Sequence, residues 1–96
     1  MDITNPLRSV LVIGRIGRAH GLRGEFRIEV LTDSPERFSQ LEECLLLSAD
    51  EKHSRPVRVE YARVSIGQVL IKLSGYDKRE DAETLRGQYL AVQREQ

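Results

Sequence analysis

Apolar and polar residues alternate along much of the chain, as they do in β-strands that bury one face. The clearest example is the segment EFRIEVL, in which Phe26, Ile28 and Val30 would share a buried face. A later alternating segment places Tyr61 in phase with two valines and then changes phase, which indicates a bulge near this tyrosine. The other strands are expected at residues 10–13, 43–48, 57–66, 69–73 and 89–92.

Two short helices are expected between these strands. The first follows Ser34, which would cap it, and Phe38 would attach it to the core. The second would begin at Asp77 and end at Gly87, with Leu85 facing the core. With about six strands spaced roughly 8–12 residues apart, this order of elements favours a small all-β barrel or sandwich.

Glycine and arginine are concentrated between Gly14 and Arg27, in the sequence GRIGRAHGLRGEFR. The four glycines do not have the G-x-G-x-x-G spacing of a dinucleotide site, and a strand rather than a helix follows Gly24. The Gly-Lys-Ser/Thr sequence of a nucleotide P-loop does not occur. Gly21 and Gly24 are therefore interpreted as the bend of a hairpin that joins two strands.

The chain as a whole is neutral, but this segment is basic. Fifteen basic residues balance fifteen acidic ones, which argues against a protein that binds polyanions over its whole surface. Between Arg8 and Arg27, however, five arginines accompany a single acid, Glu25, and give a local charge of about +4. A local positive field of this kind suits a phosphate-rich partner.

A length of 96 residues fits one domain, expected at 9–96 after a flexible lead-in at 1–8. Cys44 is the only cysteine, so no intrachain disulfide can form, and a reducing, cytoplasmic compartment is expected. We expect neither a secretory signal nor a membrane span, because the chain has no apolar run of the length that either requires.

The sequence offers little support for metal binding or catalysis. His20, His53 and Cys44 do not have the spacing of a zinc site, and Cys44 lies in an apolar run typical of core. His20 and Glu25 could imitate an acid–base pair, but no nucleophile or oxyanion site accompanies them. The favoured interpretation is that Glu25 caps a loop or pairs with an arginine. We therefore expect no catalytic residue, no metal site and no cofactor.

Two explanations of the basic hairpin stay open, nucleic-acid binding and a merely solvated surface. Its arginines could contact phosphates, and His20 could stack or form hydrogen bonds. The aromatic platforms typical of single-strand binding are missing from the segment, whose only aromatic residue, Phe26, points to the core. The three tyrosines are expected at the edge of the core rather than in a binding site: Tyr61, Tyr76 and Tyr89.

The segment Gly14–Glu25 resembles the opening signature of the RimM family of bacterial ribosome maturation factors. Further matches follow in order at residues 32–33, 35–38, 69–73 and 82–87, so that the resemblance extends from Leu11 to Val92. It implies a small six-stranded antiparallel β-barrel, similar to domain II of translation factors, with one or two short helices. The resemblance covers the family's N-terminal domain, and the second domain, a PRC barrel, is expected to be absent from this chain.

The resemblance also implies a non-enzymatic assembly chaperone for the ribosome. It would act in late maturation of the 30S subunit head and in 16S rRNA processing, and would bind free 30S subunits through the basic hairpin. The expected partner is 16S rRNA of the head, a head ribosomal protein, or both. The candidate contact residues are Arg15, Arg18, His20, Gly21, Arg23, Gly24, Glu25 and Arg27.

An alternative that follows from the same resemblance is a structural role. In that case the domain would position the C-terminal PRC barrel of the same protein, and the PRC barrel would itself bind ribosomal protein S-nineteen. The loop would then contact its own partner domain rather than the ribosome. A monomer is expected in either case.

Overall fold

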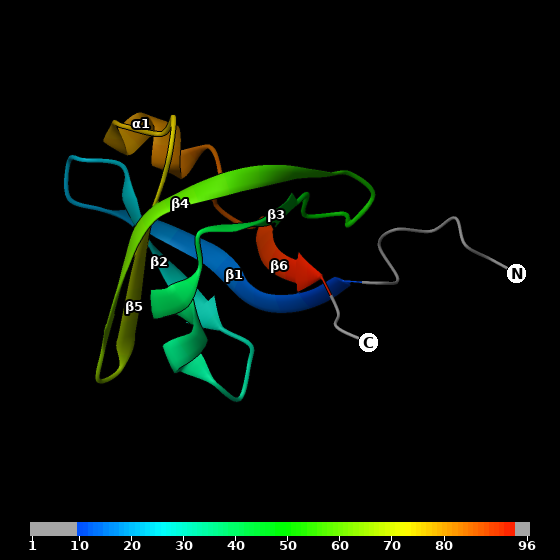
Figure 1. The fold of residues 1–96 in the computed structure, drawn as a ribbon. Coiled ribbons are helices and arrows are strands. Elements are labelled where there is room, and N and C mark those ends of the chain that lie inside the picture. Colours follow the sequence, from blue (N-terminus) through cyan, green and yellow to red (C-terminus); the bar gives the residue numbers. More distant parts are fainter. Residues whose placement is uncertain (1–9, 94–96) are drawn as a thin grey trace, which may run out of the picture.

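Six antiparallel strands close into a barrel in the order β1-β2-β5-β4-β3-β6 (Figure 1). The computed structural model describes residues 10–93, and the lead-in predicted at 1–8 lies outside the described residues. The predicted six-stranded antiparallel barrel is confirmed, and the sandwich alternative is wrong. The elements are β1 (Val10–His20), β2 (Glu25–Val30), the 3-10 helix η2 (Pro35–Gln40), β3 (Glu43–Leu47), β4 (Ser54–Ser65), β5 (Gln68–Leu73), α1 (Arg79–Glu83) and β6 (Tyr89–Gln93).

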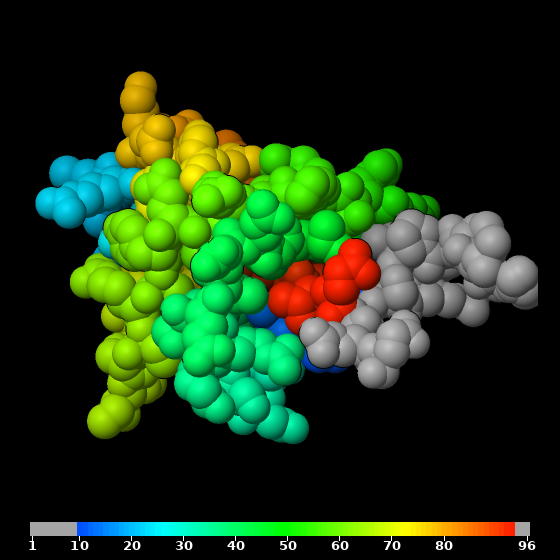
Figure 2. Space-filling view, viewed as in Figure 1, coloured from blue at the N-terminus to red at the C-terminus, as the bar shows by residue number. Residues whose placement is uncertain are grey.

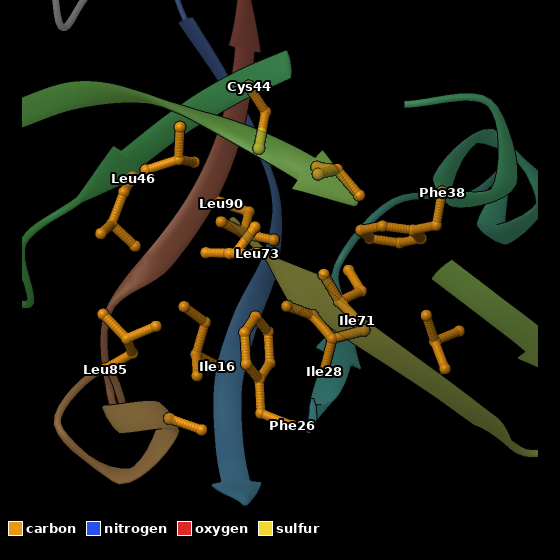
Figure 3. Close-up of a cluster of buried hydrophobic side chains, with 14 of the residues drawn as sticks. Ile16, Phe26, Ile28, Phe38, Cys44, Leu46, Ile71, Leu73, Leu85 and Leu90 are labelled. Atoms are coloured by element: carbon orange, nitrogen blue, oxygen red, sulfur yellow. The ribbon is translucent and has the colours of Figure 1, made fainter. Parts of the chain in front are cut away.

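The core of the barrel follows the alternation predicted for the second strand. Phe26 and Ile28 point inward from β2 and are buried, whereas Arg27 and Glu29 are exposed. Apolar side chains from all six strands meet them inside the barrel (Figure 3). Removing this apolar surface from water supplies the main driving force for closure, at about 25 cal/mol per Å². The largest fully buried side chains are Phe26, Phe38, Ile13, Ile16, Leu47, Ile71, Leu73 and Leu90.

The bulge predicted near Tyr61 is confirmed, but the inward phase predicted for Tyr61 itself is wrong. β4 shifts register against β5 between Val59 and Tyr61. Val59 is buried, and the shift turns Tyr61 outward, where it is 37% exposed. Ala62 packs against the core in its place. Because strand residues two apart share a face, Arg63 lies on the outer surface together with Tyr61.

Beyond the bulge, β4 and β5 continue as a hairpin that reaches past the rest of the barrel. In the view of Figure 2, the loop between β1 and β2 projects at the upper left and the tip of the β4–β5 hairpin at the lower left. Val64 and Ile66 are exposed along this hairpin although they belong to its apolar phase. The alternation in β4 therefore marks a buried face only over the part of the strand that lines the core.

The two short helices are present, but their predicted ends are wrong in detail. Ser34 precedes η2 without forming a side-chain capping hydrogen bond, and a proline at the first helical positions favours the turn through its fixed φ. α1 begins after Lys78 rather than after Asp77, because the Asp81 carboxylate accepts a hydrogen bond from the Lys78 backbone N–H at 3.2 Å. The helix also ends before Gly87, which has a φ of 90° and follows a run of turns.

Lys72 occupies a polar position in the alternation of β5, yet its side chain is buried. Its ammonium lies 2.8 Å from a carboxylate oxygen of Asp77 and 3.5 Å from one of Glu60. It also donates a hydrogen bond to the Leu73 carbonyl at 3.0 Å. A buried cation needs partners of this kind to offset its loss of hydration. The cluster joins β4 and β5 to the segment that leads into α1.

Candidate nucleic-acid interface

The β1–β2 loop, residues 21–24, lies at one end of the barrel beside α1 (Figure 1). β1 and β2 stay paired as far as His20 and Glu25, so four residues make the turn. Gly21 and Gly24 have positive φ angles of 71° and 91°, as a tight bend requires. A Cβ atom on Gly24 would lie 1.9 Å from the carbonyl oxygen of Tyr76. The loop therefore packs closely on the segment before α1, which only a glycine permits.

Two hydrogen bonds hold the loop against α1. The Arg79 guanidinium donates to the carbonyl oxygen of Gly21 at 3.0 Å. At the end of β1, the backbone N–H of Ala19 donates to a carboxylate oxygen of Glu83 at 2.9 Å. Both partners come from a helix about 60 residues farther along the chain, so contacts with the folded barrel add to the loop's own glycines in positioning the hairpin. The loop therefore presents its side chains from a fixed support.

All four arginines predicted as contacts are exposed: Arg15, Arg18, Arg23 and Arg27. β1 shifts register against β2 between Ile16 and Ala19, and this irregularity lets Arg15 and Arg18 both face outward. Arg15 lies 4.0 Å from Glu29, and both side chains are solvated, so this pair contributes little. Among residues 10–93, the other three arginines form no ion pair. Their charges are available to a partner.

Glu25 is buried at the start of β2, where two side chains of β4 bind it. The Tyr61 hydroxyl donates a hydrogen bond to one carboxylate oxygen, and Arg63 donates to the other at 2.8 Å. The prediction that Glu25 pairs with an arginine is confirmed. Because its carboxylate is occupied and buried, Glu25 is placed to support the loop rather than to touch a partner. His20 lies half-buried opposite Glu25 in the β1–β2 ladder.

The surroundings of Glu25 set the direction of two pKa shifts. Burial alone would raise the pKa of Glu25, but the hydrogen bonds from Tyr61 and Arg63, with the charge of Arg63, outweigh it and lower this pKa below 4.5. The hydrogen bond to the Glu25 carboxylate, followed by burial, raises the pKa of Tyr61. The lowered pKa of Glu25 keeps its carboxylate charged around neutral pH, and the raised pKa of Tyr61 keeps its hydroxyl protonated. These are the states that the hydrogen bond between them requires.

Acidification should therefore destabilise the chain through Glu25. A carboxyl group whose pKa is lower in the folded state stabilises the fold above its unfolded pKa, and this contribution disappears as the pH falls through the folded pKa. In Glu25→Gln, we expect the free energy of unfolding to fall less on acidification than in the wild type, because the part that begins near pH 4.5 is missing. Urea unfolding from about pH 7 down to about pH 3 measures this difference.

The matched control for this pH experiment is Glu29→Gln. It removes an exposed carboxylate from the same strand without touching the hydrogen bonds of Tyr61 and Arg63. In this control, the free energy of unfolding should still fall on acidification, because Glu25 is intact. The same pH profile for Glu25→Gln and the wild type would contradict a stabilising role of the buried carboxylate.

A hollow of about 610 Å³ opens beside the loop. It combines loop residues with the outer face of β4, so that residues distant in sequence share one surface. Its cationic side chains, Arg23 and Arg63, come from different elements, and its acid, Glu25, is the one that Arg63 neutralises. The residues that line it are His20, Gly21, Leu22, Arg23, Glu25, Tyr61 and Arg63.

Three further findings concern other kinds of site. In the part of the chain that the structure describes, no three His, Cys, Asp or Glu side chains are grouped so that they could hold a metal ion. Cys44 is buried as predicted, and burial raises the pKa of its thiol to about 12, which disfavours the reactive thiolate. No helix within residues 10–93 is long and apolar enough to cross a membrane.

The family of the chain follows from its sequence and fold together. The sequence model of the protein family described as RimM N-terminal domain matches residues 11–96. The chain belongs to the RimM family. The ribosome maturation factor RimM of a Thermoanaerobacter species is 38% identical over 80 residues, which cover 83% of this chain and 47% of that protein. The RimM protein of Streptomyces coelicolor is 41% identical over 80 residues, covering 83% of this chain and 42% of that protein.

The chain thus spans about half the length of the curated RimM relatives it matches. Solved RimM structures share its fold. A 16S ribosomal RNA processing protein RimM from Pseudomonas aeruginosa has a TM-score of 0.78 at 28% identity, over 88% of this chain and 51% of that chain. The N-terminal domain of RimM from Thermus thermophilus has a TM-score of 0.66 at 23% identity, over 88% of each chain, and supports the fold.

From outside the hairpin, the structure adds four residues to the site that the sequence interpretation did not include; within the loop it adds Leu22. Tyr61 and Arg63 form a wall of the hollow from β4, and Arg79 and Glu83 hold the loop from α1. No local pattern marks any of the four as part of the site. The phase change near Tyr61 is the one signal that pointed to an irregular, outward-facing segment. Of the predicted residues, the structure brings four together around the hollow: His20, Gly21, Arg23 and Glu25. Gly24 lies in the same loop, whereas three arginines lie along the strands outside the lining: Arg15, Arg18 and Arg27.

Proposed function

We propose that this chain acts in ribosome maturation as a non-enzymatic binding domain. The observation that carries the proposal is its membership of the RimM family together with a loop that presents arginines from a fixed support. Charge-assisted hydrogen bonds from arginine to phosphate suit an RNA-rich partner. Relatives of this chain are named ribosome maturation factors.

Within ribosome maturation, the proposed partner of the domain is the small ribosomal subunit. The domain would act late in assembly of the 30S head and in 16S rRNA processing, by binding free 30S subunits in the bacterial cytoplasm. The proposed contacts are Arg18, Arg23 and Arg27, which are exposed and form no ion pair among residues 10–93. Arg15, which lies near Glu29, and the half-buried His20 would be marginal contacts. Gly21 and Gly24 would shape the loop, and Glu25 would brace it from beneath.

Charge reversal in the loop tests this function. The double variant Arg18→Glu with Arg23→Glu should bind immature 30S subunits at least about tenfold more weakly than the wild type, because it removes two phosphate contacts and adds repulsion. Co-sedimentation of the chain with free 30S subunits at several salt concentrations measures the loss. The wild type should bind more weakly as salt rises, and the variant should depend less on salt.

The matched control reverses two charges outside the loop. Lys52→Glu with Arg58→Glu changes exposed residues of the β3–β4 hairpin and should bind like the wild type. Equal binding by the loop variant and the wild type would contradict the proposed interface. It would favour the second candidate function, in which this domain positions the other half of a RimM protein. The observation behind that alternative is that the curated relatives are about twice as long as the matched part.

A further inference from the structure

The hollow beside the β1–β2 loop combines the groups that recognise a nucleotide. Arg23 brings a net positive charge, and Arg63, whose charge Glu25 balances, brings N–H donors. Tyr61 brings an aromatic ring, and His20 brings a ring that stacks or forms hydrogen bonds. These side chains come from the end of β1, the loop and β4. The volume of about 610 Å³ is in the range of sites for small organic molecules, so the hollow has room for more than one phosphate group.

Arg63 is held in place but retains donors for a ligand. One of its terminal nitrogens donates to Glu25 at 2.8 Å, while its side chain is 58% exposed. A guanidinium has five N–H donors, so the others can bind phosphate. Glu25, the acid in the lining of the hollow, is already neutralised by this contact. A phosphate entering the hollow therefore meets donors rather than a free carboxylate.

Tyr61 supplies a surface for a base. The bulge in β4 turns it outward, and its hydrogen bond to Glu25 fixes the position of the ring. The side chain is 37% exposed and lines the hollow. Bases of single-stranded RNA stack on aromatic side chains held in this way. Leu22, which is 80% exposed at the rim, adds an apolar contact on the loop side.

We infer that the hollow binds one unpaired nucleotide of an RNA strand, with its phosphate on Arg23 and Arg63 and its base against Tyr61. The inference rests on the proposed function, since it names the kind of RNA segment that the loop would contact. Duplex RNA displays phosphates but keeps its bases stacked inside the helix, so it does not offer this combination. The site accordingly selects looped or frayed RNA over regular helices.

Fluorescence anisotropy with two labelled RNAs tests the inference. The wild-type chain should bind a short single-stranded oligonucleotide more tightly than a hairpin duplex of the same base composition. Arg63→Gln and Tyr61→Ala should each weaken single-strand binding about tenfold. Arg63→Gln should also lower the slope of log affinity against log salt by about 0.7, the value for one phosphate contact on a single strand.

Two variants serve as controls. Arg58→Gln removes an exposed arginine of the same strand, which lies 4.0 Å from Glu43, and should bind RNA like the wild type. Tyr61→Phe keeps the ring and loses the hydrogen bond to Glu25, so it should retain most of the affinity that Tyr61→Ala loses. This comparison separates stacking from a general loosening of the site.

Three results would overturn the inference. The first is wild-type affinity in both Arg63→Gln and Tyr61→Ala. The second is a preference of the wild type for the duplex. The third is full competition by inorganic phosphate or a phosphoserine peptide at the concentration at which the unlabelled oligonucleotide competes.

Failure of this site and failure of the proposed function are distinguishable. If loop charge reversal abolishes 30S binding while Arg63→Gln and Tyr61→Ala bind RNA normally, the function stands and the site fails. If the oligonucleotide binds as expected but 30S subunits do not, the site stands and the function fails.

Discussion

Gly24→Ala should destabilise the chain by about 3 kcal/mol or more. Gly24 has a φ of 91°, which alanine adopts only with strain. In addition, the new Cβ atom would lie 1.9 Å from the Tyr76 carbonyl oxygen and 2.8 Å from its carbon. These are backbone atoms, so the clash cannot be relieved by rotating a side chain. The loop would have to separate from the segment before α1. Urea unfolding monitored by circular dichroism measures the loss.

Gly21→Ala is the matched control for this effect. Gly21 lies in the same loop and has a φ of 71°, but no atom lies within 4 Å of its ideal Cβ position. The control therefore carries the conformational strain, about 1–2 kcal/mol, without the clash. Equal losses in the two variants would show that the contact between the loop and Tyr76 is unimportant.

Phe26→Ala should cost about 3–5 kcal/mol of unfolding free energy. Phe26 is fully buried and is among the largest side chains of the core (Figure 3). Its removal leaves a cavity that the surrounding strands of a closed barrel cannot readily fill. Small domains have unfolding free energies of about 5–15 kcal/mol. If the wild type lies near the low end of this range, the loss would leave a substantial fraction of the variant unfolded. Urea and thermal unfolding both report the change.

Leu22→Ala is the control for the loss of an apolar side chain near the same hairpin. Leu22 is 80% exposed, so the change should stay within about 0.5 kcal/mol of the wild type. The two substitutions remove apolar side chains only four positions apart in the sequence. A similar loss in both variants would contradict the assignment of Phe26 to the core.

The fold could be predicted from the sequence where side-chain phase and turn residues agree. In residues 25–31 the alternation alone identifies the buried face, and Gly21 and Gly24 identify the bend that precedes it. The phase of Tyr61 could not be predicted, because it depends on where the extra residue of the bulge falls. A shift of one residue reverses every side chain that follows.

The candidate site could also be predicted only in part, because some of its residues come from distant parts of the sequence. The basic loop could be recognised from its own residues, because glycine and arginine lie close together in the sequence. Its supports could not, because Arg63 and Arg79 reach the loop only when the barrel closes. The burial of Lys72 was hidden for the same reason, since its partner Glu60 lies on a different strand. Pairs such as these depend on tertiary structure and leave no local pattern.

The pairing of β1 with β6 has a consequence for the newly made protein. The first strand of the domain carries Arg15 and Arg18 but finishes its hydrogen bonding only with residues 89–93, the last strand. A nascent chain that still lacks this strand has the basic segment without the closed barrel, and barrels that depend on distant pairings fold slowly. Domains generally fold as units during synthesis. The loop would therefore take up the conformation that it has in the folded barrel only after the whole domain has been synthesised.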